Sequence, residues 1–173
     1  LPCEIAVIDL AARTPEFVAT SPLGKVPVLR DEDGTVVFDS TVIAEYLEDR
    51  YPEPKLLGSG VRERLSHRQF DELGDVSAEA AITLFMDKDS GSAAALAKAT
   101  RLLGMALREL CTRIERGDVP KDFGLGHAAV ISAVHYIELR LGEAAMQPYP
   151  AIKQWIAGFL DRKSVIGAPA PQL

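Results

Sequence analysis

Two neighbouring polar residues, Asp39 and Ser40, are the strongest candidates for ligand binding in this chain. They follow a β-branched and aromatic run at 35–38 and precede apolar residues at helical spacing over 42–47. A helix N-terminus presents unpaired N–H donors and the positive end of the helix dipole, and the expected first turn, residues 41–43, contains no acid. An outside carboxylate can therefore be held by the Ser40 hydroxyl and nearby backbone N–H groups, while Asp39 pairs with an amine of the same ligand.

The same two residues also have a purely structural interpretation. Ser and Asp are ordinary N-cap residues, so Ser40 can cap the helix while Asp39 remains a solvated turn residue. Spacing alone leaves both interpretations open, the cap and the site for a zwitterionic amino-acid end.

A second candidate is the Val26-Pro27 step at the start of an expected strand over 26–29. Proline cannot donate a ladder hydrogen bond, so it fits only at the first residues of a strand, at an edge or at a bulge. A cis bond would bend the chain and let Val26 turn its N–H and C=O toward an extended ligand. Because only about 5–6% of X-Pro bonds are cis, the sequence alone favours trans. A turn at 31–34 and a return strand at 35–38 complete the expected hairpin.

The segments SPLGKVPVL at 21–29 and FDSTVIAEYLEDRYPEPKLL at 38–57 resemble the glutathione-binding domain of the cytosolic glutathione transferases, and PEFVAT at 15–20 extends the match. The resemblance implies that Val26-Pro27 is a cis-proline turn whose valine backbone pairs with the cysteinyl part of glutathione. It also implies that Asp39 and Ser40 hold the γ-glutamyl end, with Lys25 a candidate for the glycyl end. Glutathione is then the co-substrate, and no metal is expected.

Composition limits the classes of partner. The 173 residues are 47% hydrophobic and 25% charged, which is typical of a soluble globular protein. The net charge of −6 comes without a basic stripe, so we expect no nucleic-acid partner. The sequence contains no run of 18 apolar residues and no signal-peptide pattern, so we expect no membrane partner. Cys3 and Cys111 form no CxxC motif, which disfavours disulfide or zinc scaffolds and favours the cytoplasm.

The predicted organisation is α/β plus all-α: a thioredoxin-like domain at 1–52, a linker at 53–60 and a helical bundle at 61–173. Residues 1–10 have the pattern of a strand. The resemblance implies a preceding strand and helix that carry the Tyr, Ser or Cys activating the glutathione sulfur. The first domain is therefore expected to lack that unit here, either by omission or by loss, and the catalytic residue stays unknown. Cys3 has no nearby cation or helix N-terminus to lower its pKa, so we expect a semi-buried structural thiol.

Four long helices are expected in the second domain, over 61–88, 93–116, 127–141 and 149–160. Gly74 and Ser77 suggest a bend in the first of them, and His67 is expected to be solvated. Relatives begin the third helix with a Ser/Thr cap and an Asp three residues later, where this chain has Gly124 and His127. We expect His127 to be unable to return that hydrogen bond, at a cost of about 1 kcal/mol, so that His127→Asp would stabilise the protein.

The function implied by the resemblance is addition of the glutathione thiolate to a small hydrophobic electrophile, in a cytoplasmic homodimer with the second substrate in a cleft between the domains. Two alternatives stay open. One is a non-catalytic binding module with the same fold, and the other is a glutathione-dependent isomerase or biosynthetic enzyme.

Overall fold

The structure is a computed structural model that describes residues 3–10, 12 and 14–168. The chain forms two compact units, Leu1–Pro54 and Lys55–Leu173, each described by itself below. The division falls within the expected linker at 53–60.

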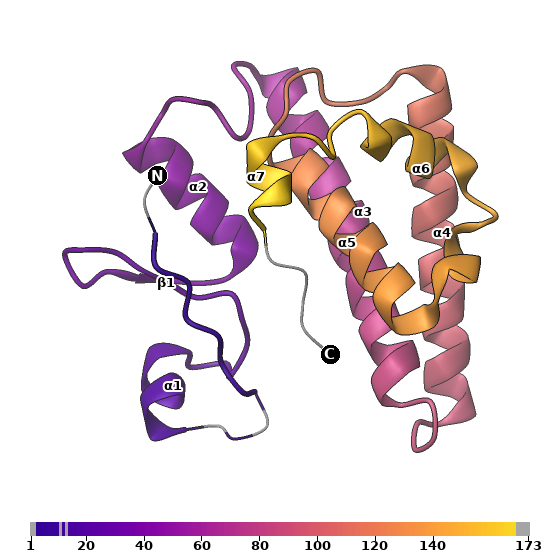
Figure 1. The fold of residues 1–173 in the computed structure, drawn as a ribbon, viewed down its shortest axis with the longest axis horizontal. Helices are drawn as coiled ribbons and strands as arrows, with labels where there is room; N and C mark the ends of the chain where they lie inside the picture. The colour runs from indigo at the N-terminus through magenta and orange to yellow at the C-terminus, as the bar shows by residue number, and fades with distance from the viewer. Residues whose placement is uncertain (1–2, 11, 13, 169–173) are drawn as a thin grey trace. The chain divides into compact units, whose positions relative to one another are not determined.

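The first unit contains two helices and one hairpin: α1 (Pro15–Thr20), β1 (Leu29–Arg30), β2 (Val36–Val37) and α2 (Ser40–Arg50) (Figure 1). The strands are antiparallel, with Leu29 opposite Val37 and Arg30 opposite Val36. The turn between them closes through the Gly34 N–H, which donates to the Asp31 carbonyl at 3.0 Å. Gly34 has φ of 87°, a value that favours glycine and that the turn pattern predicts.

The turn of the hairpin is tied to α2 by side chains. The Tyr46 hydroxyl donates to the Asp31 carboxylate, and Arg50 Nε lies 3.7 Å from the same carboxylate. The hydrogen bond from Tyr46 is the main reason that the pKa of Asp31 lies below its usual value, and it raises the pKa of Tyr46. These contacts hold the middle and the C-terminal end of α2 against the hairpin turn.

The expected strand over 1–10 is wrong within the described residues 3–10, which contain no strand. Their side chains are all exposed, so the apolar pattern buries no face, and no strand of the described chain pairs with them. The other expected strands are also shorter than predicted, because ladder pairing is limited to residues 29–30 and 36–37.

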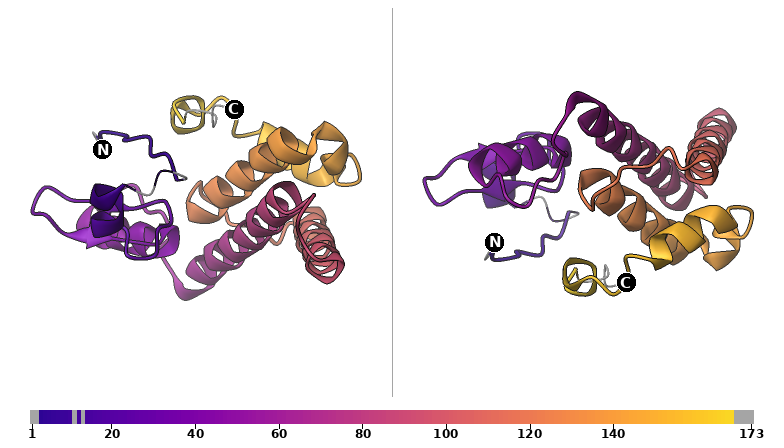
Figure 2. Two further views of the ribbon diagram at one scale, coloured as in Figure 1. Left: turned by 90° about the horizontal axis from the view of Figure 1, so that it is seen from below. Right: turned by 90° about the horizontal axis from the view of Figure 1, so that it is seen from above.

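In the second unit, the described residues form helices and no strands. This unit contains α3 (Val61–Met86), α4 (Ala93–Arg116), α5 (Leu125–Leu141), the 3₁₀ helix η1 (Glu143–Met146), α6 (Pro150–Ala157) and α7 (Lys163–Ile166). Both views in Figure 2 show α3 between α4 and α5. The core is formed by apolar residues from α3, α4, α5 and α6, among them Phe70, Leu107, Leu110, Val134, Ile137 and Ile156. None of the described helices is long and apolar enough to cross a membrane.

Helix α3 runs unbroken for 26 residues through Gly74 and Ser77. Gly74 is instead a point of close approach, since a Cβ there would lie 2.9 Å from the Ala129 carbonyl carbon on α5. The Ser77 hydroxyl donates to the Leu73 carbonyl at 2.7 Å, which satisfies it inside the helix pair.

The start of α5 corrects two expectations about histidines. His67 is buried, with 1% of its surface exposed, rather than solvated. His127 Nδ1 accepts from the Gly124 N–H at 3.4 Å, so this histidine does return a hydrogen bond to the helix start. The helix accordingly begins at Leu125, two residues before its predicted start. Because His127 is also buried among aromatic rings, His127→Asp would remove packing and bury a carboxylate, and the expected stabilisation loses its basis.

Candidate functional site

The strand register brings the candidate site residues to one end of the hairpin, opposite the turn. Leu29 pairs with Val37 and Arg30 with Val36. Val26 and Ser40 lie three residues beyond Leu29 and Val37, on the open side of the hairpin. The Val26-Pro27 step and the start of α2 therefore flank the same end of the sheet, which the sequence alone did not establish.

The Val26-Pro27 bond is cis, as the resemblance implies. The Val26 side chain is 50% exposed, and within the described residues no hydrogen bond uses its backbone N–H or C=O. The loop before it is held by Ser21, whose hydroxyl donates to the Lys25 carbonyl at 2.7 Å and accepts from the Lys25 N–H at 3.0 Å. Ser21 is buried, so it presents Val26 from a fixed loop.

The N-cap of α2 is Asp39, which corrects the interpretation of Ser40 as the cap. One carboxylate oxygen of Asp39, Oδ1, accepts from the Thr41 N–H at 3.2 Å and from the Val42 N–H at 3.4 Å. Two donors of the helix start are therefore filled from within, and the first turn is less open than its lack of an acid suggested. The sequence carried this signal, because Asp is a preferred N-cap residue.

Ser40 is the first helical residue, and it keeps its polar groups available. Across the described part of the chain, neither its hydroxyl nor its backbone N–H takes part in a hydrogen bond. A ligand carboxylate at this point would meet one hydroxyl, one N–H and the positive helix end. It would also lie beside the charge of Asp39, whose second oxygen has no partner among the described residues.

This combination favours a ligand with both charges. A lone anion would be repelled by the Asp39 carboxylate, whereas an amine on the same ligand would pair with the free oxygen of that carboxylate. An extended peptide main chain would meet the unpaired N–H and C=O of Val26 as a strand meets a sheet edge. The geometry is therefore suited to a short peptide with a free amino-acid end.

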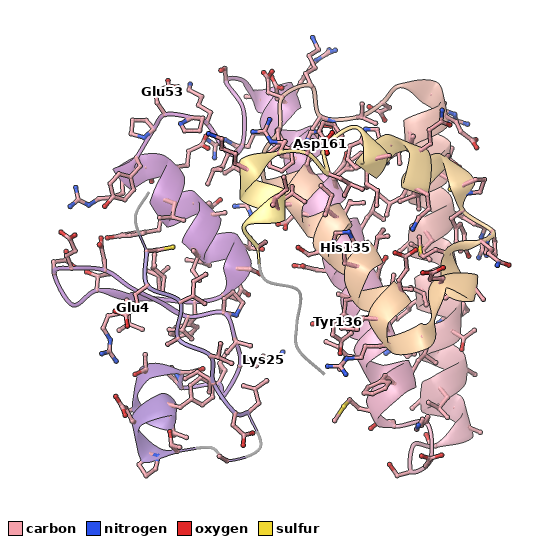
Figure 3. All side chains as sticks on the ribbon, viewed as in Figure 1. Glu4, Lys25, Glu53, His135, Tyr136 and Asp161 are labelled. Atoms are coloured by element: carbon pink, nitrogen blue, oxygen red, sulfur yellow. The ribbon has the colours of Figure 1, made fainter. Side chains whose placement is uncertain are left out.

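Two further residues that the sequence analysis considered, Lys25 and Cys3, are both exposed. Lys25 is exposed on the loop that follows α1 (Figure 3), and it is adjacent to Val26, so it can reach a ligand on that backbone. Cys3 is an exposed free thiol, not the semi-buried one expected. Among the residues that the structure describes, no three His, Cys, Asp or Glu side chains gather in a way that could hold a metal ion.

Comparison with known proteins agrees with this picture. The family model for the N-terminal domain of glutathione S-transferase matches residues 1–50. The maleylacetoacetate isomerase of Pseudomonas aeruginosa is 43% identical over 56 residues, which cover 32% of this chain and 26% of that protein. The matched segments span about a quarter of the length of such curated relatives.

Solved structures match over most of the chain. A glutathione S-transferase from Methylobacillus flagellatus with glutathione bound has a TM-score of 0.84 at 28% identity, covering 95% of this chain and 85% of that one. One from Methylobacterium radiotolerans, in complex with glutathione sulfonate, has a TM-score of 0.83 at 26% identity, covering 94% and 80%.

The fold is thus a thioredoxin-like domain followed by an all-α domain, as predicted. The chain is thus similar to the glutathione S-transferases, through residues 1–50 by the family model and over most of its length by structure.

Proposed function

We propose that this protein binds glutathione at the open end of the β1–β2 hairpin and transfers its thiolate to a small hydrophobic electrophile. The proposal is carried by two polar groups at the open end of the hairpin that have no partner among the described residues, the Val26 main chain and the Ser40 hydroxyl. The Asp39 carboxylate directly precedes Ser40. The glutathione seen in the related structures supports the proposal.

In this assignment each end of glutathione has a recognition group. The γ-glutamyl carboxylate binds Ser40, and its amine pairs with Asp39. The cysteinyl main chain pairs with Val26 at the Pro27 turn, and Lys25 attracts the glycyl carboxylate. A free thiol is mostly protonated at neutral pH, so transfer also needs a group that stabilises the thiolate.

The proposed binding site is tested by isothermal titration with glutathione. Ser40→Ala removes one hydroxyl to a charged group, so we expect affinity to fall about tenfold, since such hydrogen bonds contribute about 1.5 kcal/mol or more. Ser132→Ala is the matched control, because Ser132 is exposed on α5 in the other unit, and it should bind as the wild type does. Equal affinity of both variants would remove Ser40 from the site.

The reaction is tested by the mass of the product. Incubation with glutathione and a generic aryl halide should give a conjugate in which the glutathione sulfur replaces the halogen, which leaves as halide. The mass of the product should be that of the aryl halide plus glutathione less one hydrogen halide. The similarity to maleylacetoacetate isomerase supports a second candidate, glutathione-dependent isomerisation, in which the thiol adds and then leaves. An isomerase would convert its substrate without change of mass. Protein that binds glutathione and does neither would be a binding module.

We also propose a homodimer in the cytoplasm. The support is the similarity of residues 1–50 to the N-terminal domain of glutathione S-transferases and the two free cysteines, Cys3 and Cys111, which suit a reducing compartment. Sedimentation equilibrium should give twice the mass of one chain, and a monomer at micromolar concentration would contradict the dimer.

A further inference from the structure

The start of α5 is held by two imidazoles. The Gly124 N–H donates to His127 Nδ1 at 3.4 Å, and the Gly126 N–H donates to His67 Nδ1, on α3, at 3.3 Å. The Leu125 N–H between them donates to the Leu56 carbonyl at 2.8 Å. We call residues 124–127 with His67 the α5 corner. An imidazole nitrogen accepts a hydrogen bond only when it carries no proton, so this arrangement requires both Nδ1 atoms to be unprotonated.

The α5 corner is buried and closely packed. His67 and His127 are each 1% exposed, and their ring centroids lie 5.8 Å apart. His127 stacks on Trp155 at 4.9 Å and meets Phe159 edge-on at 4.7 Å. A Cβ on Gly124 would lie 2.1 Å from the Leu56 carbonyl oxygen and 2.6 Å from His67 Cε1. The corner therefore has little room to rearrange around a changed side chain.

Among the described residues, His127 has little to compensate a positive charge. Its Nε2 is buried with no hydrogen bond to any described residue. The titratable or charged groups that act on it are His67 from α3, Asp122 just before α5 and Arg162 after α6, whose guanidinium lies 4.0 Å from the Phe123 ring centre. Burial above all, then His67 and Arg162, lower the pKa of His127 to about 4, and Asp122 offsets this only in part.

We propose that the α5 corner is an acid-sensitive lock: neutral His127 fastens the start of α5 to α3 and α6, and protonation of Nδ1 releases it. The added proton converts His127 Nδ1 from an acceptor into a donor, so that it faces the Gly124 N–H, which is also a donor. It also places a charge against His67 and Arg162, among rings that exclude water. The helical unit is therefore expected to loosen first at this corner as the pH falls.

The sign of the pH dependence follows from the two states. The unfolded chain takes up a proton near pH 6.5, whereas the folded chain resists until about pH 4. The contribution of His127 to stability is therefore complete above pH 6.5, falls as the pH is lowered, and is lost at about pH 4. Between pH 7 and pH 5 this linkage raises the unfolding equilibrium constant about 20-fold.

Urea unfolding of the full chain, followed by Trp155 fluorescence, tests the proposal at pH 7 and pH 5. His127→Gln is the informative variant, because Gln at this helix position can still accept from the N-cap N–H but does not titrate. We expect this variant to lose most of the 20-fold rise in the unfolding equilibrium constant between pH 7 and pH 5. His135→Gln is the matched control, since His135 is exposed on the same helix (Figure 3), and it should keep the wild-type pH dependence.

Imidazole ¹⁵N NMR on the wild type decides the matter if His127→Gln does not fold. His127 should show a neutral ring with the proton on Nε2 at pH 5, and it should become protonated only as the pH approaches 4. A His127 ring that is mostly protonated at pH 5, or a pH dependence unchanged in folded His127→Gln, would overturn the lock.

Discussion

The single carboxylate of Asp39 serves as a helix cap and as a proposed ligand contact. Its Oδ1 caps α2 through the Thr41 and Val42 N–H groups, and its second oxygen is the proposed partner of the glutathione amine. The two oxygens divide these roles without conflict, because a carboxylate accepts several hydrogen bonds at once. The cap and the binding site, which the sequence presents as alternatives, are therefore compatible.

Substitution of Asp39 should separate its two roles. Asp39→Asn keeps a good N-cap, so stability should stay within about 0.5 kcal/mol of the wild type. The charge for the amine is lost, and glutathione affinity should fall about tenfold. Asp39→Ala should lose affinity similarly and in addition about 1 kcal/mol of stability. Thermal melts and glutathione titration measure both quantities, and an Asn variant that binds normally would exclude the ion pair.

Histidine shows how context decides the role of a residue type. His67 lies in a charged stretch of sequence, which predicted a solvated ring. The ring is buried because α5 crosses α3 at that point and needs an acceptor for the Gly126 N–H. Neither the crossing nor the acceptor is visible in the local sequence.

At the scale of helices, the surroundings likewise decide what a glycine contributes to stability. Gly74 and Gly104 both lie inside long helices, where glycine normally costs about 1 kcal/mol relative to alanine. Their surroundings differ. A Cβ on Gly74 would press on the Ala129 backbone at 2.9 Å, whereas one on Gly104 would meet only the flexible end of Arg108 at 3.1 Å.

The two alanine variants should therefore change stability in opposite directions. Gly74→Ala forces α3 and α5 apart, and we expect a loss of about 1–3 kcal/mol despite the better helix former. Gly104→Ala should gain about 0.5–1 kcal/mol because Arg108 can move aside. Urea midpoints give both values. If Gly74→Ala were also stabilising, the close helix contact would be wrong.

At the scale of the molecule, the two units differ in how much core they have. The first unit buries few large apolar side chains, chiefly Phe17 and Val37, while the second has a continuous core across α3, α4, α5 and α6. Amides with little buried surface around them open more readily. The proposed ligand would thus bind the less stable of the two units.

Hydrogen exchange with and without glutathione should show this difference. At 100 times the dissociation constant, a ligand stabilises its bound state by about 2.7 kcal/mol. We expect slower exchange around residues 24–43 and little change in the buried turns of α3 and α5. Ser40→Ala at the same glutathione concentration should show much less protection. Protection confined to the helical unit would contradict a site on the hairpin.

The sequence by itself determined the resemblance to glutathione transferases, the order of the helices and most of their limits. The Pro27 motif and the Asp39-Ser40 pair are local patterns, and helical periodicity is a local property of the chain. For α4, this periodicity predicted the observed limits of 93–116.

Only the tertiary structure decided which polar groups are used and which stay available. The fold assigned the cap to Asp39, left the Ser40 hydroxyl and N–H without a partner among the described residues, and buried both His67 and His127. It also showed that residues 3–10 form no strand. The physical reason is that hydrogen-bond partners and burial depend on segments distant in sequence, such as Gly126 against His67, whereas local patterns report only what each segment can do alone.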